Sequence, residues 1–233
     1  MQLHESKPTT NRRGFLGSLA IGAGAVSLAS LTIPLSLAAA PEKVSTSADD
    51  PEAWFNKIKG KHRIVFDVTK PNGTFPFTWP RVFIMTNEKT GTPEKECNEV
   101  VVLRHEAIPY AMEDRLWAKY KFGDAFKIDD AATKQPSVRN MFWQPKPGDF
   151  KVPGVGNVQI GINELQSSGV MFCVCNMALS VFSNVFAQNL KVDAGEVYKD
   201  FLSGILPEIQ LVPSGVWAVN RAQEHGCSYC FAG

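Results

Sequence analysis

Residues 169–178 read "GVMFCVCNMA", an apolar run that ends in two cysteines and continues into asparagine and small residues. A short apolar run after a glycine predicts a buried β-strand, and the residues that follow it are compatible with a helix. The stretch therefore predicts a strand-to-helix unit, with Cys173 inside the strand and Cys175 at the junction. Units of this kind build a parallel sheet with helices on its faces.

The same alternation of apolar runs and helix-like segments continues along the chain. It predicts an α/β fold with a mostly parallel, open sheet of about five strands. The predicted strands are Arg63–Val68, Val100–Arg104, Val170–Val174, Ile209–Val212 and a last short one at Tyr229–Ala232.

Helix signals lie between these strands. Pro suits a first helical position, so a helix is predicted over Pro109–Lys121. Asp193 and Ser214 are predicted to cap two later helices, and Gly226 suits the end of the second. The segment Ile128–Pro153 is rich in proline and polar residues and predicts a long loop, a feature that is often functional in compact domains. Two further helices are predicted over Thr78–Asn87 and Val158–Ser168.

The first 38 residues predict an export signal. A polar start is followed by "NRRGFLGSLA" and an apolar run of mostly small residues. The paired Arg12 and Arg13 resemble the twin-arginine consensus of a signal peptide. The run is long enough for a transmembrane helix, but Gly, Ser and Pro34 dilute it. We expect cleavage near Ala38, a periplasmic protein, and no stable membrane insertion after cleavage.

Charge and length limit the function classes of the remaining chain. Residues 1–38 hold three of the 24 basic and one of the 23 acidic residues, which leaves 21 and 22 and a formal net charge of −1. This balance excludes the basic surface that nucleic-acid binding requires. Residues 39–60 predict a polar linker and lead-in, and residues 61–233 are long enough for one domain with a sizeable core.

Four polar or reactive side chains are predicted to share one edge of the sheet. Asp67, His105, Cys175 and Ser214 each stand at the end of an apolar run. Ligands of open α/β sheets bind outside the carboxyl ends of the strands, so these residues are the first candidates for a site. Arg104 alternates to the other face, where an ion pair is its predicted role.

Cys175 is the candidate nucleophile. A thiol at a helix N-terminus meets the positive end of the helix dipole, which favours the thiolate. His105 is predicted to assist it as a base, or as a cation when protonated. The alternative is simple packing, because free cysteine is among the most buried residue types, and Cys173 is interpreted as a core residue on that ground. A disulfide within this pair is disfavoured, since sulfurs two residues apart on a strand lie about 7 Å apart.

The turn at Pro213-Ser214-Gly215 places a hydroxyl and backbone N–H groups at a helix start. Such a turn can bind an anion or simply cap the helix. We expect Ser214 and Gly215, together with Asn176 and Asp67, to form the substrate-binding part of the site.

The other three cysteines are predicted at the opposite edge of the sheet. Cys97 precedes its strand, and Cys227 precedes the last one, where Cys230 follows at a C-x-x-C spacing. An oxidising compartment favours a disulfide, either Cys227 with Cys230 or one of them with Cys97. A metal site that adds His225 and reduced packed thiols are the alternatives, and no metal is predicted.

The order of these elements resembles the DsrE/DsrF-like proteins of sulfur relay and sulfur oxidation. The resemblance covers roughly residues 61–233. It is carried by "KHRIVFDVT", "EVVVLRHEAIPYAMEDRLWAKYK", "LQSSGVMFCVCNMALS" and "LVPSGVWAVNRAQEHGCSYCFAG". The resemblance implies a three-layer α/β/α sandwich, a homo-oligomer, and a persulfide-carrying cysteine at the position of Cys175. The blocks "RHEAIPYAMEDRLWAKY" and "GCSYCFAG" and the export signal set this chain apart from the cytoplasmic sulfur carriers of the family.

The sequence therefore predicts an exported thiol-dependent sulfur carrier or sulfurtransferase without a cofactor. Its partners would be a small sulfur-containing molecule or a partner protein thiol. The alternatives are a non-catalytic module that binds a small ligand or a protein, and a redox or metal protein centred on the C-terminal cysteines.

Overall fold

The computed structural model of the protein describes residues 50–152 and 154–233. The predicted export signal at residues 1–38 lies outside these residues. Within them the elements are α2 Pro51–Phe55, β1 His62–Val68, α3 Phe75–Lys89, η2 Glu94–Glu96, β2 Cys97–Leu103, η3 His105–Ala111, α4 Asp114–Tyr120, α5 Phe122–Phe126, β3 Lys151–Val152, β4 Gly156–Asn157, α6 Ile162–Ser167, β5 Met171–Cys175, α7 Asn176–Leu190, α8 Ala194–Ser203, β6 Ile209–Val212, α9 Gly215–Glu224 and β7 Ser228–Phe231.

The centre of the fold is a five-stranded sheet in the order β6-β5-β2-β1-β7, and every neighbouring pair is parallel. The chain steps outward from β1 to β6, and α9 then returns it to place β7 on the far side of β1. The predicted α/β class and the predicted strand number are confirmed. All five strands lie within a few residues of their predicted positions.

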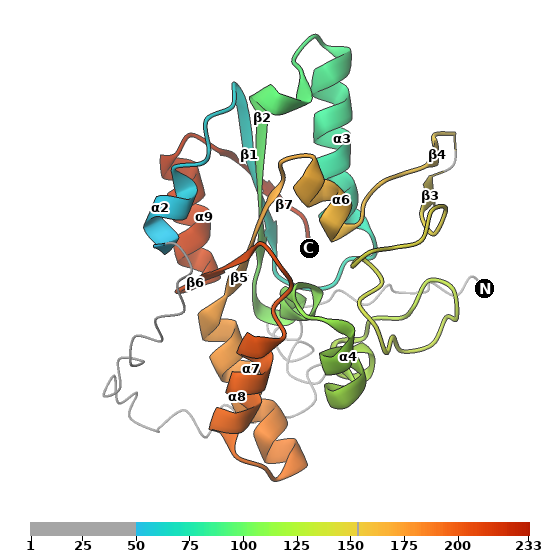
Figure 1. Ribbon diagram of the computed structural model, residues 1–233, viewed down its shortest axis with the longest axis vertical. Coiled ribbons are helices and arrows are strands. Elements are labelled where there is room, and N and C mark those ends of the chain that lie inside the picture. The colour runs from blue at the N-terminus through green and yellow to red at the C-terminus, as the bar shows by residue number, and fades with distance from the viewer. Residues whose placement is uncertain (1–49, 153) are drawn as a thin grey trace, which may run out of the picture. The chain divides into compact units, whose positions relative to one another are not determined.

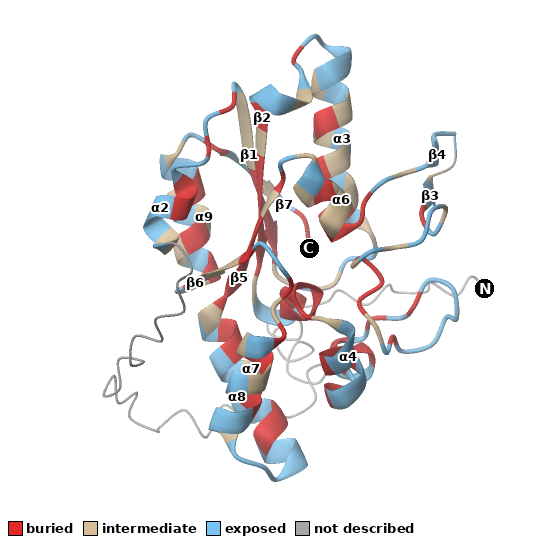
Figure 2. Cartoon of the chain, in the orientation of Figure 1, coloured by how far each residue is buried: buried red, intermediate tan, exposed pale blue. Residues whose placement is uncertain are grey.

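Helices cover both faces of this sheet and make a three-layer α/β/α arrangement. Figure 1 shows α2 and α9 on one side of the sheet and α3 and α6 on the other. Figure 2 shows that the central strands are almost continuously buried, as expected for parallel strands covered on both faces. The antiparallel pair β3 and β4 lies outside this sheet; β3 falls at the end of the predicted loop of residues 128–153, and β4 follows that loop.

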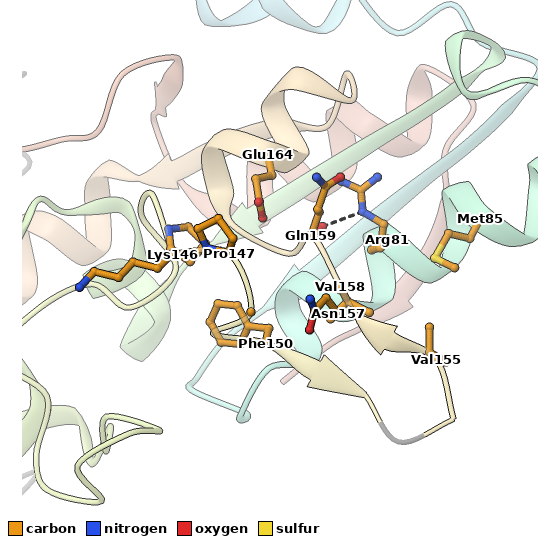
Figure 3. Close-up of a pocket in the computed structure, with 12 residues that line it drawn as sticks. Arg81, Met85, Lys146, Pro147, Phe150, Val155, Asn157, Val158, Gln159 and Glu164 are labelled. Carbon is orange, nitrogen blue, oxygen red and sulfur yellow. Dashed lines mark hydrogen bonds between the residues drawn. The ribbon is translucent and has the colours of Figure 1, made fainter.

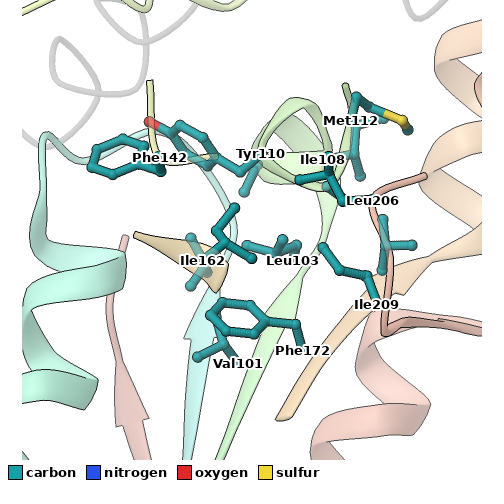
Figure 4. Close-up of a cluster of buried hydrophobic side chains, with 14 of the residues drawn as sticks. Val101, Leu103, Ile108, Tyr110, Met112, Phe142, Ile162, Phe172, Leu206 and Ile209 are labelled. Atoms are coloured by element: carbon teal, nitrogen blue, oxygen red, sulfur yellow. The ribbon is translucent and has the colours of Figure 1, made fainter. Parts of the chain in front are cut away.

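The larger core lies on the α3 side of the sheet. Phe77 of α3 packs against Phe142, Phe172 and Tyr110, with ring centroids 4.1 to 6.4 Å apart. Burial of such side chains stabilises the fold by about 25 cal/mol per Å² of apolar surface removed from water. The close-up shows Val101, Leu103, Ile108, Tyr110, Met112, Phe142, Ile162, Phe172, Leu206 and Ile209 (Figure 4).

The smaller core lies under α2 and α9. Trp54, Phe55 and Ile58 are buried in it, although residues 39–60 were predicted to be linker and lead-in. The Phe55 ring lies 5.6 Å from the ring of Trp217 in α9. The segment around α2 therefore belongs to the domain, because its apolar side chains cover the α9 face of the sheet.

The predicted helix over Pro109–Lys121 is wrong in its first half. The segment forms the 3₁₀ helix η3, extended backbone at Met112, and only then α4. The Asn140 side-chain amide donates to the carbonyls of Tyr110 and Met112 at 2.8 and 3.0 Å. These carbonyls are thus satisfied from a distant loop rather than by helical N–H groups, which periodicity alone does not reveal.

Candidate active site: a thiol pocket at the carboxyl edge of the sheet

Cys175 ends β5 and is the N-cap of the 15-residue helix α7, as predicted. Its Sγ accepts a hydrogen bond from the Ala178 N–H at 3.3 Å. A negative charge on this sulfur would meet that N–H and the positive end of the helix dipole. The residue is only 6% exposed, so access is restricted to the pocket that it lines.

Cys173, two residues earlier, is a core residue. It is fully buried against the smaller core, as its sequence position predicted. Burial raises the pKa of its thiol, and the nearby Cys175 raises it further. Cys173 is therefore a protonated, packed thiol.

Arg104 follows β2 and forms a two-pronged ion pair with the buried Asp67 of β1. Its Nε and Nη2 lie 2.7 and 2.9 Å from the two carboxylate oxygens. Tyr229 of β7 donates its hydroxyl to the same carboxylate at 2.9 Å. The hydrogen bond to Asp67 is the main cause that raises the pKa of Arg104, and the charges of Tyr229 and Cys175 add to it.

Gly215, the first residue of α9, allows the helix to lie directly on the Arg104 side chain. A Cβ atom at Gly215 would stand 2.5 Å from the Arg104 Cβ and 2.6 Å from its Cδ. Only glycine fits at that distance. This contact holds the stem of Arg104 between the sheet and α9.

His105 is exposed and opens η3 with a positive φ of 51°. This left-handed conformation is uncommon for a residue with a side chain. The His105 ring meets the Phe182 ring of α7 edge to face, with centroids 5.9 Å apart. The strained turn directs the imidazole toward α7, the helix that Cys175 caps.

These side chains line one pocket of about 390 Å³. It joins the end of β2, the junction of β5 with α7, and the start of α9. Most of its wall is apolar, and its polar groups are the guanidinium of Arg104 and the imidazole, thiol and hydroxyl of three predicted edge residues. The lining residues are Arg104, His105, Cys175, Met177, Ala178, Val181, Phe182, Ser214, Gly215 and Val216.

The structure thus brings Cys175, His105, Ser214 and Gly215 together. Asp67 lies behind Arg104 and does not line the pocket. Asn176 lies outside it too and accepts a hydrogen bond from the Tyr198 hydroxyl at 2.6 Å. The sequence reasoning missed Arg104 as a pocket residue, because strand alternation placed it on the opposite face. Its position directly before His105 was the available signal.

Ser214 has the capping role that was the simpler of its two predicted roles. Its Oγ accepts from the Trp217 N–H at 3.2 Å. Nearby, the Met177 N–H donates to the Pro213 carbonyl at 3.3 Å and ties the start of α7 to the end of β6. The start of α9 is thereby fixed beside Cys175.

The remaining cysteines lie at the opposite edge or on the last strand, and all five cysteines are free thiols in the structure. Strand β1 separates β2, which Cys97 begins, from β7. Two strand spacings are about 9.6 Å, beyond the reach of a disulfide without backbone movement. Burial is the main cause that raises the pKa of Cys227 to about 11, against the opposing charge of Arg63. Within the described residues no group of three or more His, Cys, Asp or Glu is arranged to hold a metal ion.

A second pocket, of about 540 Å³, lies between α3 and the loop that carries β3 and β4 (Figure 3). Arg81 anchors the loop there, since its Nε donates to the Gln159 carbonyl at 2.7 Å. Lys146 points away from the pocket in this view. The lining residues Arg81, Met85, Pro145, Lys146, Pro147, Gly148, Phe150, Val155, Asn157, Val158, Gln159 and Glu164 include no cysteine, serine or histidine.

Comparison with known proteins leaves the family open. No family model matches the chain, and no curated protein matches it. One solved structure that matches is the protein of unknown function MTH1491 from Methanobacterium thermoautotrophicum. It is 15% identical to this chain over 73% of the chain and 99% of its own length, with a TM-score of 0.38. The resemblance to DsrE/DsrF-like proteins therefore stays a prediction.

Proposed function

We propose that this protein is a thiol-dependent acceptor and carrier of sulfane sulfur, with Cys175 as the nucleophile. The observation that supports the proposal is the position of Cys175. It caps α7 and shares a pocket with an imidazole and a guanidinium. A helix N-terminus and neighbouring cations are the surroundings in which reactive thiolates occur.

The reaction needs no external oxidant or reductant. His105 would take the thiol proton, and the Cys175 thiolate would attack the sulfane sulfur of a donor. The bond between that sulfur and the rest of the donor breaks, and its electron pair leaves with the donor. The product is a persulfide on Cys175. A second thiolate, on a small molecule or a partner protein, then attacks the outer sulfur and regenerates the Cys175 thiolate.

The biological setting is part of the same proposal. An export signal at residues 1–38 would place this chemistry in the periplasm, and relatedness to DsrE/DsrF-like proteins would imply a homo-oligomer. Within the described residues no helix is long and apolar enough to cross a membrane. Identification of the mature N-terminus in a periplasmic fraction would test the setting separately from the chemistry.

Peptide mass spectrometry after incubation with a sulfane donor tests the chemistry. We expect a mass increment of one sulfur on the Cys175 peptide that reductant removes. Cys175→Ser abolishes this product, whereas the matched control Cys230→Ser retains it. A Cys175 that reacts with no thiol reagent until the protein unfolds would contradict the proposal.

The apolar wall and the 6% exposure of Cys175 favour a second candidate, a pocket that binds a small apolar ligand without reaction. In that case Cys175 packs against the ligand and α7. Native mass spectrometry of the purified protein would then show a retained small molecule. Bulky substitution at the mouth, such as Val181→Trp, would release it, while Cys175 would remain unmodified by sulfane donors.

A further inference from the structure

The ion pair of Arg104 with Asp67 lies beside the pocket that Cys175 lines. Asp67 is buried at the base of the network, and it takes three hydrogen bonds from Arg104 and Tyr229. Arg104 lines the pocket, whereas Asp67 does not. The pair is therefore a dipole whose positive end faces the pocket beside Cys175.

One part of the Arg104 guanidinium remains for a ligand. Nε and Nη2 are held by Asp67, and Nη1 has no acceptor among the residues that the structure describes. The side chain is 28% exposed. An arginine fixed on two of its nitrogens is ordered in advance, so less conformational entropy is lost when a third nitrogen binds an anion.

The pocket presents no negative side chain that would oppose an anion beside Arg104, because none of its lining residues is acidic. The start of α9 lies against Arg104 through Gly215, so the positive end of a second helix dipole faces the same place. The same pocket is thus lined by Arg104, the start of α9 and the thiol of Cys175.

We propose that Arg104, positioned by Asp67 and Tyr229, binds the anionic group of the sulfur donor beside Cys175. This inference rests on the proposed function and names its substrate class: a sulfane sulfur bonded to an oxyanion group, as in thiosulfate. The Cys175 thiolate attacks the sulfane sulfur, the sulfur–sulfur bond of thiosulfate breaks, and the electron pair leaves with sulfite. Arg104 holds the oxyanion of the donor and the negative charge of the leaving group.

Two alkylating reagents of the same size test the anion site apart from sulfur transfer. Iodoacetate is anionic and iodoacetamide is neutral, and both react with the thiolate. We take the ratio of the iodoacetate rate to the iodoacetamide rate at Cys175, measured by peptide mass spectrometry. This ratio is independent of the fraction of Cys175 that is thiolate. We expect a higher ratio at Cys175 than at Cys230, the internal reference in the same protein.

The double variant Asp67→Asn/Arg104→Gln removes both charges without leaving a buried one unpaired. We expect it to lower the ratio at Cys175 about fivefold, which corresponds to ~1 kcal/mol, and to leave the ratio at Cys230 unchanged. Tyr229→Phe keeps both charges and should lower the ratio less. With thiosulfate as donor, the double variant should raise KM more than it lowers kcat, and a neutral organic polysulfide should show no such change.

The outcomes separate this inference from the proposed function. If Cys175 reacts with iodoacetamide and the double variant leaves the ratio unchanged, the anion site is wrong and the thiol chemistry stands. If Cys175 reacts with neither reagent, both the anion site and the proposed thiol chemistry are wrong. Should the double variant fail to fold, salt replaces it, because ~0.5 M salt screens a partly exposed charge. The ratio at Cys175 in the unaltered protein must then fall with salt while that at Cys230 does not.

Discussion

At the scale of single residues, Glu99 is a buried carboxyl group with an unsatisfied oxygen atom. It lies on β2, is 2% exposed, and its Oε2 has no hydrogen-bond partner within the described residues. Burial is the main cause that raises its pKa to about 8; Arg81 opposes this shift and Glu94 adds to it. A carboxyl group in this position keeps its proton near neutral pH.

Glu99 should make the protein less stable as the pH rises. The unfolded chain releases this proton near its ordinary pKa of about 4.3, whereas the folded chain keeps it up to about pH 8. The folded state binds more protons over that range, so the free energy of unfolding falls between these values and levels off above them. In urea titrations at several pH values we expect Glu99→Gln to remove this fall, and the exposed Glu196→Gln to preserve it.

Gly215 should tolerate no side chain. Gly215→Ala places a methyl group within 2.6 Å of the Arg104 side chain and must displace it or α9. Overpacking of this kind costs about 1–3 kcal/mol, measured as the change in the free energy of unfolding. Gly195→Ala in α8 is the control, since its methyl group would meet only the Asp193 side chain. Equal stability of the two variants would refute the close contact between α9 and Arg104.

At the scale of elements, the site depends on how two helices begin. Cys175 caps α7 and Ser214 caps α9, and the end of β6 links the two starts through Pro213. Cys175 is the last residue of β5, and Ser214 stands two residues after β6 ends. The sheet therefore fixes the positions of the caps, and the helices point their N-termini into one pocket.

Ser214 should act on stability rather than on Cys175. Loss of the bond to the Trp217 N–H in Ser214→Ala should lower the free energy of unfolding by ~1 kcal/mol. Ser214→Asn, which retains a capping side chain, should restore it. The iodoacetamide rate at Cys175 is expected to be the same in all three proteins. A slower rate in Ser214→Ala alone would assign the hydroxyl to the reaction.

At the scale of the whole molecule, the segment before β1 completes the domain. Phe55 is fully buried between Trp54 and Trp217, with ring centroids 4.9 and 5.6 Å away. This aromatic group closes the α9 face of the sheet. A linker would not be buried in this way, because linkers bury little apolar surface.

Phe55→Ala should therefore destabilise the protein as a core substitution does. We expect a loss of about 3–5 kcal/mol in the free energy of unfolding, from lost burial and the cavity that remains. Phe75→Ala, at an exposed aromatic residue of α3, should change it far less. Calorimetry of the two variants compares them directly, and a neutral Phe55→Ala would show that this segment is not part of the core.

Sequence patterns alone predict the five strands, the parallel α/β class and the capping positions of Cys175, Asp193 and Ser214. These features depend on neighbouring residues: the apolar run, the residue that ends it and the side chain that caps the next helix. Three other features come from tertiary contacts: Arg104 faces the pocket, Asn140 binds the carbonyls where a helix was predicted from Pro109, and Phe55 belongs to the core. Each of these depends on groups far apart in the chain, and local sequence patterns carry no information on which distant group will supply a charge, a hydrogen bond or an apolar surface.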